Sequence, residues 1–259
     1  MSGTSAGARH LIAIGIGAGD PRHLTLEAVD AIGRTDVFFL PDKGKRTERL
    51  LQVRAEILRA HAADAARTVA VPDPPRDSTT TGTDEYRAQV DDWRRRRAER
   101  WTRVVHEELA PGETGAFLVW GDPALYDSTL DVLDEIRAAG AEVTCEVIPG
   151  ISSISALAAH HGTTWTRVGR PVRITTGRPG VDRPDLPEDT LVMLDVPAAI
   201  DARRGGGWWI HWGAYVGTPD ELSVAGPLDE VADRIAEVRA DARERHGWIM
   251  DSCLLRPPA

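Results

Sequence analysis

Residues 11–21 have the sequence LIAIGIGAGDP. The first half of this stretch is apolar without alternation, which is typical of a strand buried on both faces of a parallel sheet. The second half is a glycine-rich turn, and a helix is predicted directly after it, over Thr25–Arg34. A buried strand, a tight turn and a helix in this order predict an α/β fold with the turn at the carboxyl edge of the sheet.

The same alternation of apolar runs and helical patterns continues to about residue 160. Further strands are predicted at 36–41, 68–71, 115–123 and 142–150, and further helices at Thr47–His61, Tyr86–Leu109, Ser128–Ala139 and Ser152–His160. The stretch 72–83 is rich in Pro, Asp and Thr and predicts an irregular loop. We therefore predict a first domain, residues 1–168, built on a mostly parallel sheet flanked by helices.

The pattern changes after residue 168. The runs TLVMLDVP, WWIHWGAYVG, ELSVAG and GWIMDSCLL favour strands with few helices between them, and one long helix is predicted at Leu228–Arg245. This part of the chain predicts a second domain, residues 169–259, of mixed α/β structure.

Composition excludes several classes of protein. The chain has 259 residues, of which 42% are hydrophobic and 27% charged, so it is neither disordered nor fibrous. Its formal charge of −9 disfavours binding to nucleic acid. Only two cysteines are present, and no run is apolar enough to predict a membrane span or a secretory signal. These features predict a cytoplasmic protein without a disulfide framework, a metal site or a membrane anchor.

Two more loops follow predicted strands and precede predicted helices. Residues 121–126 read GDPALY and residues 149–153 read PGISS. In the glycine-rich turn described above, which is the first of the three loops, Asp20 stands where a dinucleotide-binding turn has its third glycine. A carboxylate there would repel a pyrophosphate. Ser152 and Ser153 are also good N-cap residues, so the third loop by itself predicts no more than a helix start.

In this order, GIGAGDP, GDPALYDS and VIPGISS resemble the motifs of the tetrapyrrole methylase family. The resemblance covers nearly the whole chain and implies a two-domain α/β enzyme. Such an enzyme transfers a methyl group from S-adenosylmethionine, bound between the domains, to an anionic tetrapyrrole. Within the family, the GDPALYDS loop, the long 75–105 insertion and the 208–223 stretch are most similar to a C-methyltransferase of cobalamin biosynthesis that also releases acetate. The family also implies a homodimer.

The resemblance implies a set of cofactor-binding residues. In the first domain these are Pro21, Gly121, Asp122, Pro123 and Tyr126, followed by Ser152 and Ser153. In the second domain they are Asp195, Ala214, Tyr215, Ala225, Gly226 and Pro227. At the position of Asp195 many relatives carry methionine, and the carboxylate could instead hold a ribose hydroxyl.

The substrate carries several carboxylates, which arginine binds well. Arg22, beside the first loop, is the leading candidate, and Gly17 and Asp20 are assigned to the same substrate-binding loop. Arg170, Arg173 and Arg178 are weaker candidates that could equally be surface residues.

Release of acetate calls for water to add to a ketone, with a base and a hydrogen-bond donor in reach. His211 and Tyr215 lie four positions apart on a predicted strand, which would put both on one face. We predict His211 as the base and Tyr215 as the donor, against the alternatives that bulk water suffices or that His211 is only a buried polar residue.

Other functions remain open from the sequence. Another methylase of the same fold, such as a precorrin-2, precorrin-3 or precorrin-4 enzyme or a diphthine synthase, would share these motifs. A tetrapyrrole carrier without catalytic activity is a further alternative, and a nicotinamide oxidoreductase is disfavoured by Asp20. The run Arg94–Arg97 between Trp93 and Trp101 suggests a solvated helix face or a dimer contact rather than nucleic-acid binding.

Overall fold

A computed structural model describes residues 7–42, 48–74, 83–138, 142–178, 181–247 and 249–258 of the chain. Contacts between Cα atoms divide it into two compact units. Unit 1 comprises Met1–Gly17 and Pro21–Ile151, and unit 2 comprises Ala18–Asp20 and Ser152–Ala259. None of the helices in the described ranges combines the length and apolar character needed to cross a bilayer.

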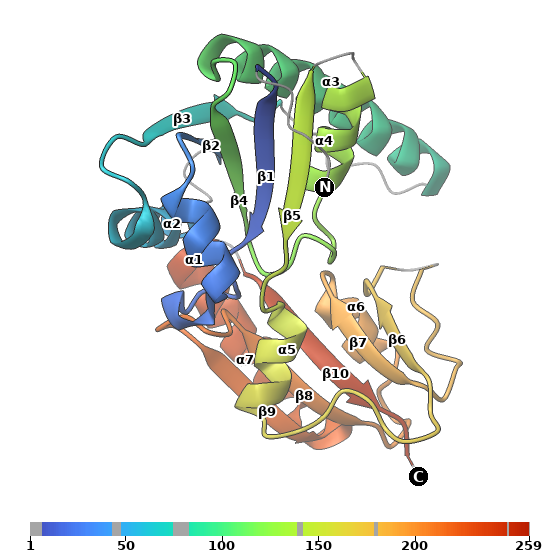
Figure 1. The fold of residues 1–259 in the computed structure, drawn as a ribbon. Coiled ribbons are helices and arrows are strands. Elements are labelled where there is room, and N and C mark those ends of the chain that lie inside the picture. Colours follow the sequence, from blue (N-terminus) through green and yellow to red (C-terminus); the bar gives the residue numbers. More distant parts are fainter. Residues whose placement is uncertain are drawn as a thin grey trace. The chain divides into compact units, whose positions relative to one another are not determined.

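Unit 1 is built on a five-stranded sheet in which every neighbouring pair is parallel, as predicted (Figure 1). The strand order is β3-β2-β4-β1-β5. The strands are β1 (Arg9–Gly15), β2 (Val37–Asp42), β3 (Arg67–Pro72), β4 (Thr114–Val119) and β5 (Val143–Ile148). The last five residues of β1 are buried, because helices cover both faces of the sheet.

The helices of unit 1 divide between the two faces. α1 (Leu26–Gly33) and α2 (Glu48–His61) pack on one face, around Ile12, Phe38 and Leu118. α3 (Thr83–Glu108) and α4 (Thr129–Ala138) cover the other face (Figure 1). The short 3-10 turn η1 (Pro21–His23) precedes α1.

This arrangement creates a topological switch at β4. The connections from β1 and from β2 run through α1 and α2 on one face, whereas the connection from β4 runs through α4 on the other. β4 lies between β2 and β1 in the sheet. The loop that leaves β4 therefore runs to the face opposite to that taken by the loops that leave its two neighbours. Open α/β sheets bind ligands in the crevices that such reversals leave at the carboxyl ends of the strands.

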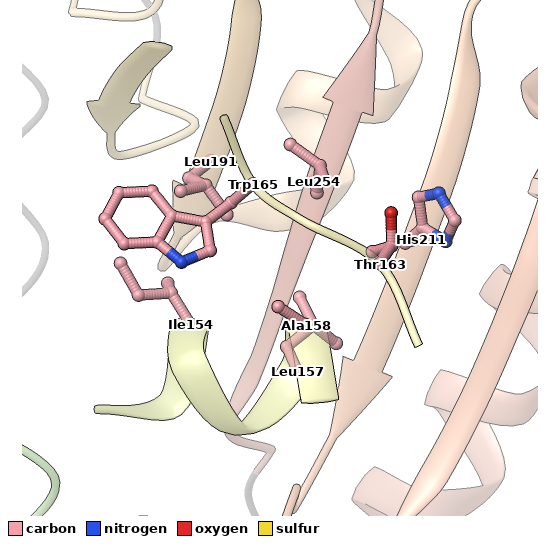
Figure 2. A pocket seen from close by; sticks show the side chains of 8 residues that line it. All are labelled: Ile154, Leu157, Ala158, Thr163, Trp165, Leu191, His211 and Leu254. Carbon is pink, nitrogen blue, oxygen red and sulfur yellow. The ribbon is translucent and has the colours of Figure 1, made fainter. Parts of the chain in front are cut away.

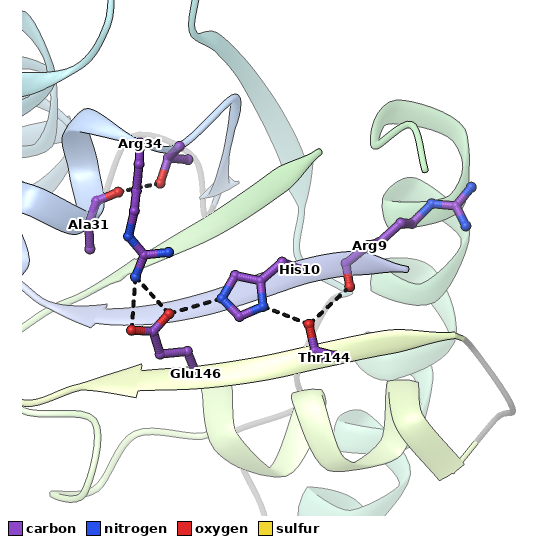
Figure 3. A network of polar contacts seen from close by, with 7 residues as sticks. Arg9, His10, Ala31, Arg34, Thr144 and Glu146 are labelled. Atoms are coloured by element: carbon purple, nitrogen blue, oxygen red, sulfur yellow. Dashed lines mark hydrogen bonds and ion pairs between the residues drawn. The ribbon is translucent and has the colours of Figure 1, made fainter. Parts of the chain in front are cut away.

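A polar network holds β1, β5 and the end of α1 together near the start of β1 (Figure 3). His10 contacts Thr144 at 2.7 Å through Nδ1 and Glu146 at 2.9 Å through Nε2. Arg34, just after α1, donates to both carboxylate oxygens of Glu146 at 2.8 and 2.7 Å. Burial raises the pKa of Glu146, but hydrogen bonds from Arg34 and His10 outweigh it and bring the pKa below the usual range.

Unit 2 contains a mixed sheet, as predicted, in the order β6-β7-β10-β8-β9. The strands are β6 (Val172–Thr175), β7 (Asp189–Met193), β8 (Trp209–Ala214), β9 (Leu222–Pro227) and β10 (Asp251–Arg256). β6 and β7 are parallel, and the remaining pairs are antiparallel. One face packs on α6 (Val196–Asp201) and α7 (Leu228–His246), and the other packs on α5 (Ser153–His160).

One element of unit 2 differs from the sequence prediction. The run TLVMLDVP was expected to form a strand throughout, but β7 ends at Met193 and α6 begins at Val196. Leu194 and Asp195 have φ angles of 67° and 52°, which turn the chain out of the strand. The chain passes from unit 1 to unit 2 after Ile151, because the apolar side of α5 packs on β8 and β10 of unit 2. The division into domains at 168 and 169 stays a prediction.

Candidate active site

Three glycines stand where β1, β4 and β5 end. A Cβ atom on Gly150 would lie 2.1 Å from the carbonyl oxygen of Gly121, and one on Gly15 would lie 2.5 Å from the backbone nitrogen of Gly150. Real side chains do not tolerate such distances, so only glycine allows the three backbones to pack together.

Gly17 and Gly121 link the first two loops directly. The Gly121 N–H donates to the Gly17 carbonyl at 2.8 Å, and the Gly17 N–H donates back at 3.3 Å. Both residues have positive φ angles, 79° and 71°, which glycine adopts without strain. Because the Gly17 N–H already has a partner, the first loop does not present this group to a pyrophosphate, in agreement with the argument from Asp20.

Asp122 joins the second and third loops. One carboxylate oxygen accepts from the backbone N–H of Gly150 at 2.9 Å, and the other accepts from the backbone N–H of Ala124 at 2.8 Å. The side chain therefore holds the loop after β4 against the loop after β5. This is a structural role that the motif alone did not predict.

The residues around η1 lie at the surface of their own units. Pro21 and Arg22 are exposed, and Asp20 is half-buried. The Leu24 N–H donates to the Pro21 carbonyl at 3.3 Å, and His23 packs against Gly17. Arg22 is thus open to solvent, as a substrate-binding arginine requires.

Backbone strain gives an independent signal for the site. In the described part of the chain, the non-glycine residues with positive φ are Tyr126, Leu194, Asp195 and Tyr215. Three of them are cofactor-binding residues predicted from the family motifs, and Leu194 adjoins one. Residues held in this region of φ/ψ space cost roughly 1–3 kcal/mol each and concentrate at ligand-binding sites. Tyr126 is 51% exposed, and partial burial raises its pKa, which keeps the phenol neutral.

In unit 2, the loops after the parallel strands β6 and β7 pack together. Gly177 donates to the Leu194 carbonyl at 2.9 Å, and a Cβ on Gly177 would lie 2.1 Å from the Asp195 carbonyl. Arg178 donates to the Asp195 carboxylate at 2.9 Å. Arg173 likewise pairs with Glu188 at 2.7 Å. Two of the arginines considered for the substrate thus have internal acidic partners, whereas Arg170 is exposed.

Ser152 caps α5, as its position before the helix predicts. Its Oγ accepts from the Ser155 N–H at 3.2 Å, and its side chain is buried. Ser153 is the first residue of the helix and is half-buried. The hydroxyl and backbone groups of these two serines, which are predicted to bind the cofactor, therefore also form the start of α5.

The predicted residues on β8 and β9 do not come together. In the antiparallel register Ala214 pairs with Leu222, whereas Ala225 pairs with His211 and Pro227 with Trp209. At about 3.4 Å per residue, Ala225 lies roughly 10 Å and Pro227 roughly 17 Å along the ladder from Ala214. Gly226, between them, is buried. Ala225–Pro227 was expected to form a turn, but these residues are the second half of β9, which extends away from the Ala214–Tyr215 end of the hairpin.

The expectation that His211 and Tyr215 share a face is wrong. His211 points toward α5 and lines a small pocket with Leu157, Trp165 and Leu254 (Figure 2). Tyr215 lies beyond the end of β8 with a φ of 50°, which turns its ring into the opposite core, 5.0 Å from the His246 ring. Strand alternation does not extend past Ala214, so the four-residue spacing fails to predict the face.

His211 is in an apolar environment. Its Nδ1 atom is buried and has no hydrogen-bond partner in the described part of the chain. Burial, with nearby His161 and Arg256, lowers the pKa of His211 to about 4, so the ring is neutral near pH 7. A neutral ring with a free nitrogen could accept a proton, although so low a pKa makes it a weak base.

Two arginines of unit 1 are buried: Arg54, which the sequence did not single out, and Arg97, for which the predicted solvated helix face is wrong. Arg97 on α3 lies with its guanidinium 5.1 Å from the Trp93 ring and donates to Asp73 at 2.9 Å and Ser128 at 2.5 Å. It therefore anchors the end of the GDPALYDS loop. Arg54 on α2 is buried too. Their sequence positions, on polar helices rich in arginine, gave no signal that distinguishes them from surface residues.

Other reactive groups do not form a centre. Burial raises the pKa of both Cys145 and Cys253, which disfavours a nucleophilic thiolate. Within the described ranges, no group of three or more His, Cys, Asp or Glu side chains is placed to hold a metal ion.

Comparison with known proteins defines the class to which this fold and these loops belong. Residues 10–232 match the model of the family described as tetrapyrrole (corrin/porphyrin) methylases. The chain belongs to this family of methyltransferases, which confirms the resemblance inferred from the three loops.

Particular relatives are more specific. The chain is 42% identical over 257 residues to a precorrin-6A synthase (deacetylating) of Sinorhizobium sp, covering 98% of this chain and 97% of that one. It is 32% identical to a precorrin-2 C(20)-methyltransferase of the same genus over 66% of this chain and 62% of the other. A crystal structure of a cobalamin synthesis related protein (CobF) from Corynebacterium diphtheriae superposes with a TM-score of 0.81. It is 32% identical and covers 96% of this chain and 99% of that one.

Proposed function

We propose that the protein is an S-adenosylmethionine-dependent C-methyltransferase of cobalamin biosynthesis that converts precorrin-5 to precorrin-6A. It methylates C1 of the macrocycle, and acetate is released. The observation that carries this proposal is the 42% identity, over nearly the full length of both chains, to a precorrin-6A synthase. The shorter and weaker match to a precorrin-2 methyltransferase makes that enzyme the second candidate.

In methyl transfer the protein mainly has to align the donor and the acceptor. The carbon–sulfur bond of the sulfonium breaks as an electron-rich macrocycle carbon forms the new carbon–carbon bond. Alignment of donor and acceptor can contribute about 7 kcal/mol or more to such a step. A site built from backbone loops, with few ionisable side chains, suits this reaction. The glycine cluster at Gly15, Gly121 and Gly150 supports it because it holds the loops after β1, β4 and β5 against one another at the carboxyl ends of these strands.

Loops of each unit are assigned to S-adenosylmethionine. In unit 1 these are Pro21, the Gly121–Pro123 loop and Tyr126. In unit 2 they are Ser152, Ser153, Asp195, the Ala214–Tyr215 turn and the Ala225–Pro227 segment. Strained backbone at Tyr126, Asp195 and Tyr215 supports three of these assignments. Along the β8–β9 ladder Ala225 lies roughly 10 Å from Ala214, so the two segments would contact different parts of the cofactor.

The anionic tetrapyrrole is assigned to Gly17, Asp20 and Arg22. Arg22 has the solvent exposure that a carboxylate partner needs. Replacing Arg22 by Ala is expected to raise KM for the tetrapyrrole in a salt-dependent manner, while affinity for S-adenosylhomocysteine is unchanged. An unchanged KM at every salt concentration would remove Arg22 from the site.

For the deacetylation, His211 is the residue proposed to act as base. Water adds to the ketone, the bond between the carbonyl carbon and the macrocycle breaks, and its electron pair returns to the macrocycle while acetate leaves. Because Tyr215 lies on the other face of the sheet, a single reacting group cannot contact both side chains. His211→Ala should slow acetate release and leave an acetylated, methylated intermediate, whereas unchanged release would assign the step to bulk water.

The main test is a product analysis with several acceptors. The protein, precorrin-5 and methyl-labelled S-adenosylmethionine are incubated together, and labelled precorrin-6A and acetate are measured by mass spectrometry. Labelled product from precorrin-2 instead would support the second candidate. Heat of binding with S-adenosylhomocysteine but no product from any acceptor would support a carrier. We also propose a cytoplasmic homodimer, which light scattering tests against the 28.2 kDa mass of one chain.

A further inference from the structure

Arg54 is a buried cation beside β4 in unit 1. The residue is 7% exposed and lies on α2, one turn before the core residue Ile57. Its Nε donates to the carbonyl oxygen of Leu118 at 3.2 Å. That carbonyl needs a donor, because β2 stops pairing with β4 at Phe39 and Phe117, and Pro41, the next donor position in the register, has no N–H.

The rest of the guanidinium has no such partner. The described residues give Arg54 no other hydrogen bond and no carboxylate within the 4.0 Å of an ion pair. Its two Nη atoms are not among the polar atoms sealed from solvent. Burial lowers the pKa of Arg54 to about 10, although Asp127 nearby favours the charged form.

Arg97 shows what a satisfied guanidinium looks like in the same region. It is buried to a similar degree, yet it has Asp73, Ser128 and two tryptophan rings as partners. Its positive charge also disfavours the charge on Arg54. A buried cation that is unpaired costs stability, and such a cost is retained mainly at functional sites.

The position of Arg54 matches a ligand site of the fold. The connections from β2 and β4 run on opposite faces of the sheet, so the carboxyl ends of these two strands form a second switch point beside the one between β4 and β1. We propose that the Nη atoms of Arg54 bind a carboxylate of the tetrapyrrole substrate, in bidentate fashion, at this second switch point. This inference rests on the proposed function and adds a residue to those assigned to the substrate.

Arg54→Gln isolates the proposed role. The Gln amide nitrogen occupies the place of Nε, so the hydrogen bond to Leu118 is retained while the Nη groups and the charge are removed. We expect the melting temperature to stay the same or rise, because an unpaired buried charge is lost. KM for the tetrapyrrole should rise about tenfold or more, and binding of S-adenosylhomocysteine should not change.

Two further variants serve as controls. Arg59→Gln removes an exposed positive charge from the same helix and should change neither quantity. Arg54→Met removes Nε as well, leaves the Leu118 carbonyl without its donor, and should combine the rise in KM with a fall in melting temperature. Fluorescence titration with uroporphyrin III, a stable polycarboxylate macrocycle, gives a binding measurement independent of turnover.

The outcomes separate this inference from the proposed function. Weaker uroporphyrin III binding and a raised KM in Arg54→Gln, with wild-type behaviour in Arg59→Gln, would support the site. If the wild-type enzyme converts precorrin-5 and Arg54→Gln matches it in KM and in uroporphyrin III binding, the inference is overturned and the function stands. A wild-type protein that methylates no tetrapyrrole would overturn the function, and unaltered uroporphyrin III binding in Arg54→Gln would still decide against the site.

Discussion

The two units bring their candidate site residues into place by different means. In unit 1, three glycines and the Asp122 carboxylate bind the loops after β1, β4 and β5 to one another. In unit 2, the turns after β7 and β8 are set by left-handed backbone at Asp195 and Tyr215, which are not glycines. The first arrangement depends on close packing that leaves no room for a side chain, whereas the second stores strain in the backbone.

This difference predicts opposite responses to mutation. Tight packing between backbones is sensitive to any added atom, so changes in unit 1 should affect stability and cofactor binding together. Strain at Asp195 is relieved by glycine, so a change there should affect binding without a loss of stability. The following predictions run from the largest expected effect to the smallest.

Gly150→Ala should have the largest effect. Its Cβ would lie 2.1 Å from the Gly121 carbonyl oxygen, and neither backbone can move without opening the cluster. We expect a loss of about 3 kcal/mol in the free energy of unfolding and no measurable heat with S-adenosylhomocysteine. Urea denaturation and calorimetry measure the two quantities.

Gly162→Ala is the matched control in unit 2. This glycine has a φ of 58° and open space around it, so alanine there meets only the intrinsic cost of left-handed backbone, about 1–2 kcal/mol. If Gly150→Ala were no more destabilising than Gly162→Ala, close packing of the loops would not be what holds unit 1 together.

Asp122→Ala should have the next largest effect. Removing the carboxylate leaves the Gly150 and Ala124 N–H groups without their acceptor, at a cost of about 1–3 kcal/mol. As the loops separate, we expect binding of S-adenosylhomocysteine to lose about 1.4 kcal/mol of free energy, which corresponds to a tenfold fall in affinity. Asp122→Asn keeps one acceptor oxygen, so its stability and its affinity should lie between those of the wild type and of Asp122→Ala. Weaker binding at unchanged stability would show instead that the carboxylate contacts the cofactor directly.

Asp195→Gly tests the strained turn of unit 2. Glycine relieves left-handed backbone worth about 1–2 kcal/mol, while the exposed pair with Arg178 contributes less than about 1 kcal/mol. Stability should therefore hold or increase slightly. Binding of S-adenosylhomocysteine should weaken several-fold if the carboxylate holds a ribose hydroxyl. Asp195→Asn, which tolerates the same φ, separates loss of charge from loss of strain, and equal affinity in all three proteins would exclude a cofactor role.

The smallest effect concerns pH and the network at the start of β1. A lowered pKa of Glu146 in the folded state stabilises the protein above the ordinary value of 4.5 and loses this contribution as the pH falls through the lower folded value. The melting temperature should decline on acidification less steeply in Glu146→Gln than in the wild type. Cofactor binding at neutral pH should be the same in both, because the network lies away from the glycine loops. Parallel declines would show that other carboxylates dominate acid unfolding.

The sequence by itself determined the parts that depend on local pattern. Continuous apolar runs such as residues 11–17 predicted buried parallel strands, since a strand covered on both faces has no polar alternation. The glycines after residues 11–14 predicted a tight turn at the end of the first strand, and Ser152 before an apolar helix predicted its cap. The order of these loops also sufficed to place the chain in its family.

Only the tertiary structure decided where side chains point and which charges meet. α6 follows β7 because two left-handed residues interrupt an apolar run that would otherwise continue as a strand. Tyr215 leaves the face of His211 because the strand ends one residue earlier. Arg54, Arg97 and Arg178 look alike in the sequence. Among the described residues, however, Arg54 donates only to the Leu118 carbonyl, whereas Arg97 is held by Asp73 and Ser128 and Arg178 pairs with Asp195. These outcomes depend on contacts between residues far apart in the chain, which periodicity and spacing do not encode.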